Sequence, residues 1–357
     1  MAEVPCGEGK GTVRTDQPWA ADGVADREWL RERPGDRDEL RQRLRRLPPG
    51  HPSSPVETDG TPKPPEPGLR RHETAERDTA READSRPLTD AEHAEHVNEV
   101  RARLDKARAD GLATETRYVT DPDGETWTRE RRAGHDAIIA HLYAAAGDVP
   151  CERRAILAGG LPGAGKTTVL EQYAGIDRSQ YLTINPDEIK NEMAERGMIP
   201  RVPDLTPMEA SDLVHEESSH IAKQLALRAI PEGKNIIWDI TMSSWESTER
   251  RIRDLRAVGY SRVEGIFVDI PVDVGVHRSD ARHREGHDSY RDGHGQGGRF
   301  VPAEVIAAQA DPDWGSGNRR TFEEIKPRLD SWLLCDNSVD GRDPLLVDSG
   351  GREEGKR

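Results

Sequence analysis

The stretch GGLPGAGKTTVL at 159–170 constrains the fold of this chain most strongly, because it fits the phosphate-binding pattern G-x-x-x-x-G-K-[ST] at every fixed position. An apolar segment, AILAGG at 155–160, precedes the loop, and TTVLEQYA at 167–174 favours a helix after it. Glycines in such a loop let backbone N–H groups point at an anion, and the helix N-terminus reinforces the attraction. The stretch therefore predicts a nucleoside triphosphate site between a strand and a helix.

Two side chains of this loop have predicted roles in holding ATP and Mg²⁺, the two cofactors that the motif indicates. Lys166 is expected to contact the β- and γ-phosphates, and the hydroxyl of Thr167 is expected to ligate Mg²⁺. The predicted nucleotide-binding residues are Gly160, Leu161, Pro162, Gly163, Ala164, Gly165, Lys166, Thr167 and Thr168.

Apolar strand-like segments alternate with helical ones after residue 154. The expected strands are AILAGG, QYLTINPDEI, KNIIWDIT, VEGIFVDIP and SWLLCDN, and helices are expected at 207–229 and 244–258. Such alternation predicts an α/β class, a P-loop NTPase or kinase fold with a parallel sheet flanked by helices. Ligands of these sheets bind beyond the carboxyl ends of the strands, so candidate site residues are sought there.

Composition divides the chain into four expected parts. With 33% hydrophobic and 33% charged residues, the sequence is too polar to pack from end to end. We expect a disordered Pro- and charge-rich tail at 1–87, a helical preface at 88–149, the kinase domain at 150–348 and a flexible C-terminal tail at 349–357. In the preface, Thr89 and Glu92 have capping-box spacing, and a second helix is predicted at 128–145.

Charge and cysteine spacing argue against several classes of partner. The net charge of −15 disfavours general nucleic-acid binding, and no stretch is long and apolar enough to predict a membrane span or a signal peptide. The three cysteines lie far apart and are expected to be reduced thiols in a cytoplasmic protein. His283, His287 and His294 match no metal-ligand spacing, so the sequence assigns no metal to them.

Candidate catalytic residues follow the later strands. Asp187 could take the proton of an attacking hydroxyl, or it could serve the first turn of a helix. Asp239 could support Mg²⁺ or face the acceptor, and Thr241 points to the same side.

Cations are expected to cover the phosphates. Arg278, Arg282 and Arg284 lie on one predicted helix, and a glycine-rich loop then delivers Arg299. Such residues either neutralise charge in the transition state or form an ordinary solvated basic surface.

From about 150 to 347 the chain resembles the zeta toxin family of P-loop kinases, on the glycine loop, INPDEIK, HEESSHIAKQLALRAIPEGKNIIWDITMSS and the lid ending GGRFVP. The resemblance implies a kinase that phosphorylates the 3'-hydroxyl of UDP-N-acetylglucosamine, with toxin–antitoxin activity. The roles that it implies are Lys166 as phosphate-binding lysine, Asp187 as general base, Arg282 and Arg299 as charge-stabilising arginines, and Glu217, Asp239 and Thr241 facing the acceptor sugar.

The chain departs from the family at two places beside the expected acceptor. Asn185 stands where the toxins usually have an acid, and Asp239-Ile240-Thr241 replaces Glu-Gly-Thr. The alternatives are therefore a kinase for an antibiotic or nucleoside hydroxyl, and a nucleotide-dependent binding protein without phosphotransfer. In family pairs an antitoxin helix blocks the nucleotide site; here the helices of 89–145 either do so in cis or complete the core.

Overall fold

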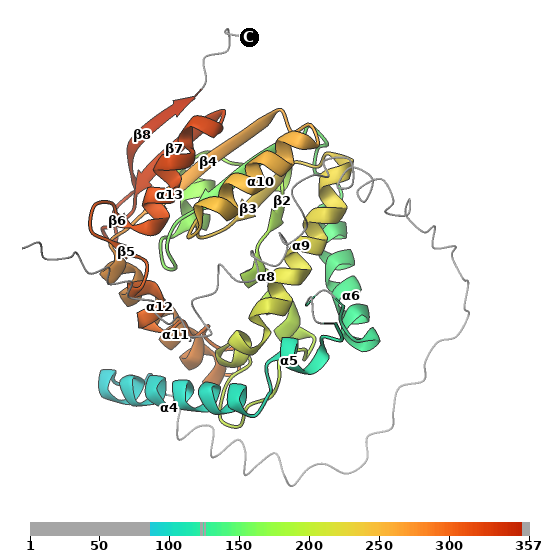
Figure 1. Ribbon diagram of the computed structural model, residues 1–357. Coiled ribbons are helices and arrows are strands. Elements are labelled where there is room, and N and C mark those ends of the chain that lie inside the picture. Colours follow the sequence, from blue (N-terminus) through green and yellow to red (C-terminus); the bar gives the residue numbers. More distant parts are fainter. Residues whose placement is uncertain (1–85, 122–123, 125, 352–357) are drawn as a thin grey trace, which may run out of the picture.

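The computed structural model describes residues 86–121, 124 and 126–351 (Figure 1). The tail expected at 1–87 lies outside the described residues except for its last two, and so do residues 352–357 of the expected C-terminal tail.

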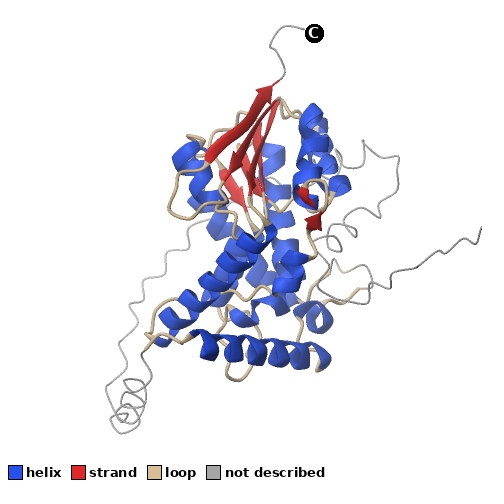
Figure 2. Ribbon diagram, turned by 90° about the vertical axis from the view of Figure 1, so that its left-hand side faces the viewer, coloured by secondary structure: helices blue, strands red, loops and turns tan. Residues whose placement is uncertain are grey.

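A six-stranded sheet in the order β2-β3-β1-β4-β7-β8 forms the centre of the domain. All neighbours from β2 to β7 pair in parallel, and helices flank the sheet (Figure 2). The predicted parallel α/β fold is thereby confirmed. The strands are β1 (Arg154–Gly159), β2 (Leu182–Ile184), β3 (Ile236–Asp239), β4 (Arg262–Asp269), β7 (Ser331–Asp336) and β8 (Leu345–Gly351), with a separate small pair, β5 (Ala310–Asp311) and β6 (Gly315–Ser316).

Strand β8 was not predicted, and it moves the start of the expected C-terminal tail. It pairs antiparallel with β7, and its last residue, Gly351, lies opposite Ser331. Residues 349–351 therefore belong to a strand. Strand β8 lies at the edge of the sheet, where backbone hydrogen bonds hold it and its side chains remain exposed; Leu345, for example, is 67% exposed. Because no side chains need to be buried, the sequence shows no clear apolar pattern for this strand.

Both faces of the sheet are buried, which explains the continuous apolar runs of its strands. Ala155 and Leu157 of β1 belong to the large core cluster on the side of the main helices. Ile156 and Ala158, the alternate residues, pack on the opposite face with Leu170. The core thus fixes β1 firmly just before the glycine loop begins.

The helices are α4 (Asp90–Ala109), α5 (Thr114–Tyr118), α6 (Arg129–Ala145), α7 (Lys166–Thr168), α8 (Pro186–Glu195), α9 (His215–Glu232), α10 (Trp245–Ala257), α11 (Val272–Arg291), α12 (Ala303–Ala307) and α13 (Gly317–Ile325). The capping box predicted at Thr89 and Glu92 is present at the start of α4. The helix expected at 207–229 instead begins as a 3-10 turn at Glu209–Val214 and becomes α9 at His215. After the glycine loop, α7 passes into a π-helix at Val169–Tyr173.

The helical preface packs in two places. Helix α4 lies at the end of the molecule away from the sheet, where ion pairs join it to α11, whereas α6 lies along α9 (Figure 1). Ile138 and Ile139 of α6 are buried in the main core cluster. Of the two roles considered for the preface, α6 therefore completes the core.

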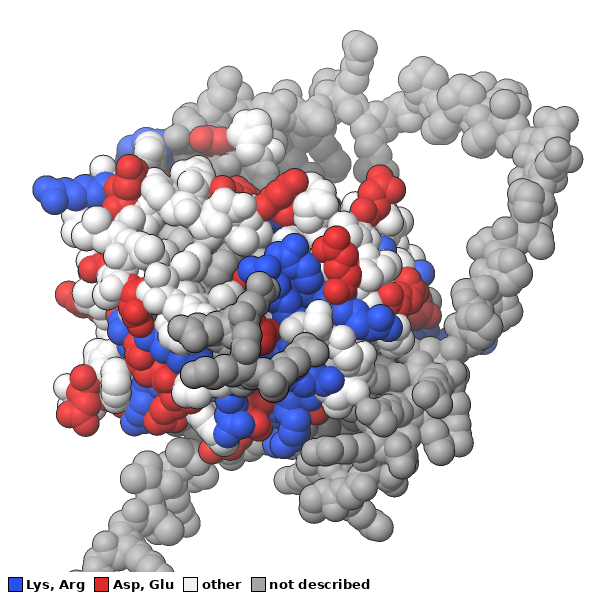
Figure 3. All heavy atoms as spheres, turned by 90° about the horizontal axis from the view of Figure 1, so that it is seen from above, with Lys and Arg blue, Asp and Glu red and all other residues white. Residues whose placement is uncertain are grey.

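Surface charge is mixed on the face opened to view in Figure 3. Lys and Arg side chains lie interspersed with Asp and Glu across that face, without a continuous basic area among its described residues. None of the helices described in the structure has the length and apolar character needed to cross a membrane.

Candidate nucleotide-binding and transfer site

The glycine loop leaves the carboxyl end of β1 in a conformation that favours glycine. Gly160, Gly163 and Gly165 have φ angles of 140°, 82° and 80°. A Cβ on Gly163 would lie 2.9 Å from the carbonyl oxygen of Gly275 in α11, and one on Gly165 would lie 2.6 Å from Nδ2 of Asn337. Backbone and side-chain atoms therefore approach the loop so closely that larger residues would distort it.

Two polar side chains donate hydrogen bonds to carbonyl groups of the loop. Asn337 Nδ2 donates a hydrogen bond to the Ala164 carbonyl at 2.8 Å. Arg278 donates to the Gly163 carbonyl at 3.4 Å and forms an ion pair with Asp340 at 2.6 Å. These contacts fix the Gly163 and Ala164 carbonyls, and the backbone of the loop is further held by hydrogen bonds from the Gly160 N–H to the Thr241 carbonyl and from the Ala164 N–H to the Leu161 carbonyl.

Lys166 begins α7 and reaches across the mouth of the loop. Its Nζ lies 3.3 Å from the carbonyl oxygen of Gly160 and 3.4 Å from Oδ1 of Asp239. Thr167 and Thr168 follow it with exposed side chains. The ammonium group thus stands where a phosphate held by the loop would meet it.

The loop opens into a cavity of about 3090 Å³. A site for one drug-sized ligand occupies roughly 300–1,000 Å³, so this cavity has room for two substrates. The predicted site residues that line it are Leu161, Pro162, Gly163, Ala164, Gly165, Lys166, Thr167, Thr168, Asp187, Asp239, Thr241, Arg282 and Arg299.

Asp187 lies in the first turn of α8, but another residue caps that helix. The side chain of Asn185 accepts a hydrogen bond from the Asp187 backbone N–H at 2.8 Å. The Asp187 carboxylate instead forms ion pairs with the Arg299 guanidinium and, at 3.5 Å, with the Lys190 ammonium. Loss of hydration by itself would raise the pKa of Asp187, but Arg299, Lys190 and Lys166 hold that pKa well below its usual range. Asp187 is therefore a carboxylate at neutral pH.

Asp239 ends β3 between an amide and a cation. Its Oδ2 accepts a hydrogen bond from Asn185 Nδ2 at 3.0 Å, and its Oδ1 faces Lys166. Burial raises the pKa of Asp239, Lys166 opposes the rise, and Asp187 adds to it. An amide at 185 can donate to this carboxylate, whereas an ionised acid there would repel it. The contact gives a physical reason for the first departure from the family pattern.

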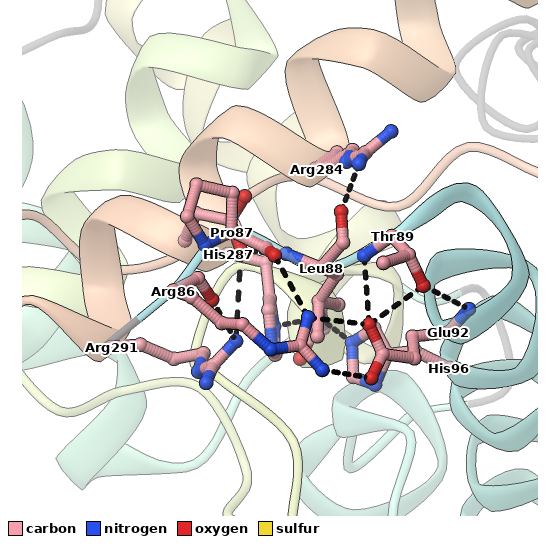
Figure 4. A network of polar contacts seen from close by, with 11 residues as sticks. Arg86, Pro87, Leu88, Thr89, Glu92, His96, Arg284, His287 and Arg291 are labelled. Carbon is pink, nitrogen blue, oxygen red and sulfur yellow. Dashed lines mark hydrogen bonds and ion pairs between the residues drawn. The ribbon is translucent and has the colours of Figure 1, made fainter. Parts of the chain in front are cut away.

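The arginines of the predicted lid separate into two groups. Arg282 on α11 and Arg299 on the following loop both line the cavity. Desolvation, followed by the charge of Arg299, lowers the pKa of Arg282. Arg284 instead turns toward the start of α4, where it pairs with Asp90 at 2.7 Å and donates to the Leu88 carbonyl (Figure 4). The expectation that Arg284 covers the phosphates is therefore wrong.

Glu217 also lies elsewhere than expected. Its carboxylate is fully buried on α9 and is not part of the cavity lining; the guanidinium of Arg131 donates to it from Nε at 2.7 Å, and His135 Nε2 lies 2.6 Å away. Both partners come from α6, so the acid ties the preface to the core. Glu216, one residue earlier, lines the cavity in its place.

The second departure from the family pattern lies on the side of the cavity where the resemblance places the acceptor. Ile240 and Thr241 both line it. Asn318 Nδ2 donates to the Thr241 carbonyl at 2.9 Å, while the Thr241 hydroxyl donates to Ser243 Oγ at 3.2 Å. Ile240 also packs against the main core cluster, so the wall here is stiffer and bulkier than glycine would make it.

Sequence reasoning missed three residues of the site. Lys190 is nearly fully buried and touches both Asp187 and, at 3.4 Å, Nδ1 of His215. Two of the three carry a signal in the sequence. Lys190 lies three residues after Asp187, on the same face of a helix, and Asn337 directly follows the end of a strand. His215 carries no such signal, because its contact joins two helices distant in sequence.

Residues 150–313 match the family model described as Zeta toxin. This confirms the resemblance over that segment, which is shorter than the 150–347 that the motifs suggested. A search of curated proteins finds no match.

Solved structures resemble the chain only distantly. The AvrRxo1-ORF1:AvrRxo1-ORF2 complex with sulphate ions has a TM-score of 0.49 and 18% identity, covering 62% of this chain and 68% of that one. The same complex with ATP has a TM-score of 0.49 and 18% identity, covering 65% and 72%. A structure of the PezAT chromosomal toxin–antitoxin system of Streptococcus pneumoniae has a TM-score of 0.43 and 15% identity, covering 63% and 82%. These likenesses are too distant to carry an argument about the reaction.

Proposed function

We propose that this chain is a zeta-toxin-like kinase that transfers the γ-phosphoryl group of ATP to a hydroxyl of a small molecule, UDP-N-acetylglucosamine being the expected acceptor. One observation carries the proposal: an ionised Asp187, the Lys166 ammonium and two arginines line a single cavity at the mouth of the glycine loop. A site that only bound nucleotide would not need a carboxylate held ready among these cations.

The loop fits a triphosphate because its glycines at 160, 163 and 165 leave no room for side chains, because residues 161–168 line the cavity, and because a helix begins directly after it. The Thr167 hydroxyl would hold Mg²⁺, and Asp239, at the end of the neighbouring strand β3, would support the ion. When bound, Mg²⁺ neutralises charge on the phosphate oxygens. Lys166 then adds its own positive charge at the β- and γ-phosphates.

Asp187 would accept the proton of the acceptor hydroxyl. As the oxygen–phosphorus bond to the acceptor forms, the bond between the γ-phosphorus and the bridging oxygen breaks and ADP leaves; the proton passes to the Asp187 carboxylate. A strong base is unnecessary, because in a loose, largely dissociative transition state the attacking oxygen has formed little of its new bond and has gained little acidity. The lowered pKa of Asp187 is therefore compatible with this role.

The pairing of Arg299 with Asp187 suggests how the site is armed. In this structure the guanidinium neutralises the carboxylate. A triphosphate in the loop offers Arg299 a second, more strongly charged partner. If the Arg299 guanidinium moved from Asp187 to the γ-phosphate, the Asp187 carboxylate would be free to accept the hydroxyl proton. Arg282, on the same side of the cavity, would stabilise the transferring group together with Arg299.

The identity of the acceptor is tested at Ile240. Because Ile240 lines the cavity where the family has glycine, Ile240→Gly should raise turnover of UDP-N-acetylglucosamine. Equal turnover of an antibiotic or nucleoside before and after this change, with no turnover of the sugar nucleotide in either protein, would favour the second candidate, a kinase for another small hydroxyl compound.

The reaction itself is tested with Asp187→Asn. We expect ATP affinity within about threefold of wild type and a phosphoryl-transfer rate reduced by about 10²–10⁴-fold, the usual contribution of a general base. Glu195→Gln is a matched control, because this exposed acid lies on the same helix, α8, outside the cavity lining. A normal transfer rate in Asp187→Asn would refute the assignment, and ATP binding without transfer to any acceptor in the wild type would indicate a binding protein.

A further inference from the structure

Three histidines surround one buried carboxylate oxygen at the junction of α4, α11 and the 3-10 turn Glu209–Val214. Glu209 Oε1 lies 2.6 Å from Nε2 of His96, 3.0 Å from Nε2 of His283 and 3.0 Å from Nδ1 of His287. Glu209 is fully buried, and its other oxygen accepts a hydrogen bond from the Thr206 N–H at 2.8 Å. Figure 4 shows His96 and His287 reaching toward each other from α4 and α11.

Hydrogen bonds alone do not account for the arrangement of these three histidines. A carboxylate oxygen offers two lone pairs, yet three imidazole nitrogens converge on Oε1 of Glu209. The rings of His96 and His287 are also close, with centroids 4.0 Å apart. The cluster therefore concentrates four potential ligand side chains around one buried oxygen atom.

We propose that His96, Glu209, His283 and His287 form a binding site for a divalent transition metal, with Zn²⁺ the best match. Imidazole nitrogens and one carboxylate oxygen are ligands that zinc takes in tetrahedral sites. At bond lengths of about 2.0–2.2 Å, tetrahedral ligand atoms stand about 3.3 Å apart. The observed nitrogen–oxygen separations of 2.6–3.0 Å would have to widen by about 0.3–0.7 Å to reach that spacing.

The ligand atoms of His96, Glu209 and His287 lie within 4.8 Å of each other. His283 Nε2 lies 3.0 Å from the same Glu209 oxygen, and the ring of His283 also groups with His93 and Asp280. The Thr206 N–H fixes the orientation of the Glu209 carboxylate, as second partners do for metal ligands. The proposal departs from the sequence analysis, which assigned no metal to His283 and His287. The other two ligands, His96 and Glu209, come from segments far from α11 along the chain, so sequence spacing did not bring the four together.

This site is separate from the transfer site but touches the same helix. The four ligands are outside the lining of the cavity, whereas Arg282, the neighbour of His283, is part of that lining. A bound ion would fasten α4 to α11 more firmly than the existing pairs of His93 with Asp280 at 2.9 Å and Arg284 with Asp90 at 2.7 Å. It would thereby fix the helix that presents Arg282.

The experiment uses the full chain, freed of metal by a chelator and then titrated with CoCl₂ and ZnCl₂. We expect one ion per chain and the intense visible absorption of tetrahedral cobalt(II), which Zn²⁺ should abolish. His96→Gln and His287→Gln should each weaken Zn²⁺ binding by at least about 100-fold, because each removes a direct ligand. His294→Gln is the control: it changes an exposed histidine just after α11 that lies outside the cluster, and it should bind like the wild type.

A wild-type chain that gives no cobalt absorption and no saturable Zn²⁺ binding would overturn the proposal, and this result does not depend on how any variant folds. Wild-type affinity in both His96→Gln and His287→Gln would equally overturn it. A second readout is amide hydrogen exchange: Zn²⁺ should slow exchange in α4 of the wild type and of His294→Gln, but not in His287→Gln.

Discussion

Glu217 gives the sharpest contrast between a catalytic and a structural role. The family resemblance places it beside the acceptor, whereas the structure buries its carboxylate against Arg131 and His135 of α6. Glu217→Gln keeps the shape of the side chain but leaves the Arg131 charge without its counter-ion. The Arg131 side chain is only 10% exposed, so water cannot replace the lost partner.

Breaking a buried ion pair on one side costs about 3–5 kcal/mol. At roughly 2–4 °C per kcal/mol for a domain of this size, the midpoint of thermal unfolding should fall by about 6–20 °C. The free energy of unfolding is measured by chemical denaturation of the wild type, Glu217→Gln, Arg131→Met and the double variant. Because the two residues share one interaction, the double variant should lose about 1–3 kcal/mol less than the sum of the single losses.

The acceptor KM separates the two roles. If Glu217 is structural, Glu217→Gln assayed well below its unfolding midpoint should keep the acceptor KM of the wild type. Unchanged stability together with a raised acceptor KM would refute the structural reasoning and restore the role implied by the resemblance.

Three further predictions follow from the loop and from the buried acids. Lys166→Met should lower kcat/KM for ATP by about 10²–10³-fold in steady-state assays, because it removes a charge aimed at the transferring phosphate; a loss below tenfold would contradict this position for the ammonium. Gly163→Ala should destabilise the protein and weaken ATP binding more than Gly175→Ala does. Both glycines have positive φ angles, but a Cβ at 163 would lie 2.9 Å from the Gly275 carbonyl oxygen, whereas one at 175 would meet open space. Equal losses of stability in calorimetry would count against a tightly packed loop. Burial by itself would raise the pKa of Glu217, but hydrogen bonds from His135 and Arg131 lower it on folding. Its contribution to stability is therefore present above the ordinary glutamate pKa of about 4.3 and is lost as pH falls, so Glu217→Gln should lose less stability than the wild type between roughly pH 5 and pH 3. Parallel stability profiles for the two proteins over this range would argue against the ion pair.

Local sequence patterns predicted the elements that carry their own signals. The glycine loop, the five parallel strands and the capping box of α4 could be predicted because spacing and apolar runs determine them. Strand β8 could not, because an exposed edge strand needs no apolar pattern.

Position at a strand end was enough to predict which residues line the cavity, whereas it was not enough where the direction of a helical side chain decides its neighbours. Lys166, Asp187 and Asp239 line the cavity as the topology requires. Glu217 and Arg284 lie on helices whose partners, α6 and α4, come from the preface; which neighbour a helical side chain meets depends on packing that spacing alone does not give.

The most direct test of the proposed reaction is the mass of the product. The wild type, Asp187→Asn and Glu195→Gln are each incubated with ATP and Mg²⁺, in separate reactions with UDP-N-acetylglucosamine and with a panel of antibiotics and nucleosides that carry hydroxyl groups. The acceptor in each reaction is then examined by mass spectrometry. A singly phosphorylated sugar nucleotide formed by the wild type and Glu195→Gln, and strongly reduced in Asp187→Asn, is the predicted result. ATP consumed at equal rates by all three proteins, with the sugar nucleotide unmodified and no other hydroxyl compound of the panel phosphorylated, would contradict the proposal that this chain is a kinase acting through Asp187.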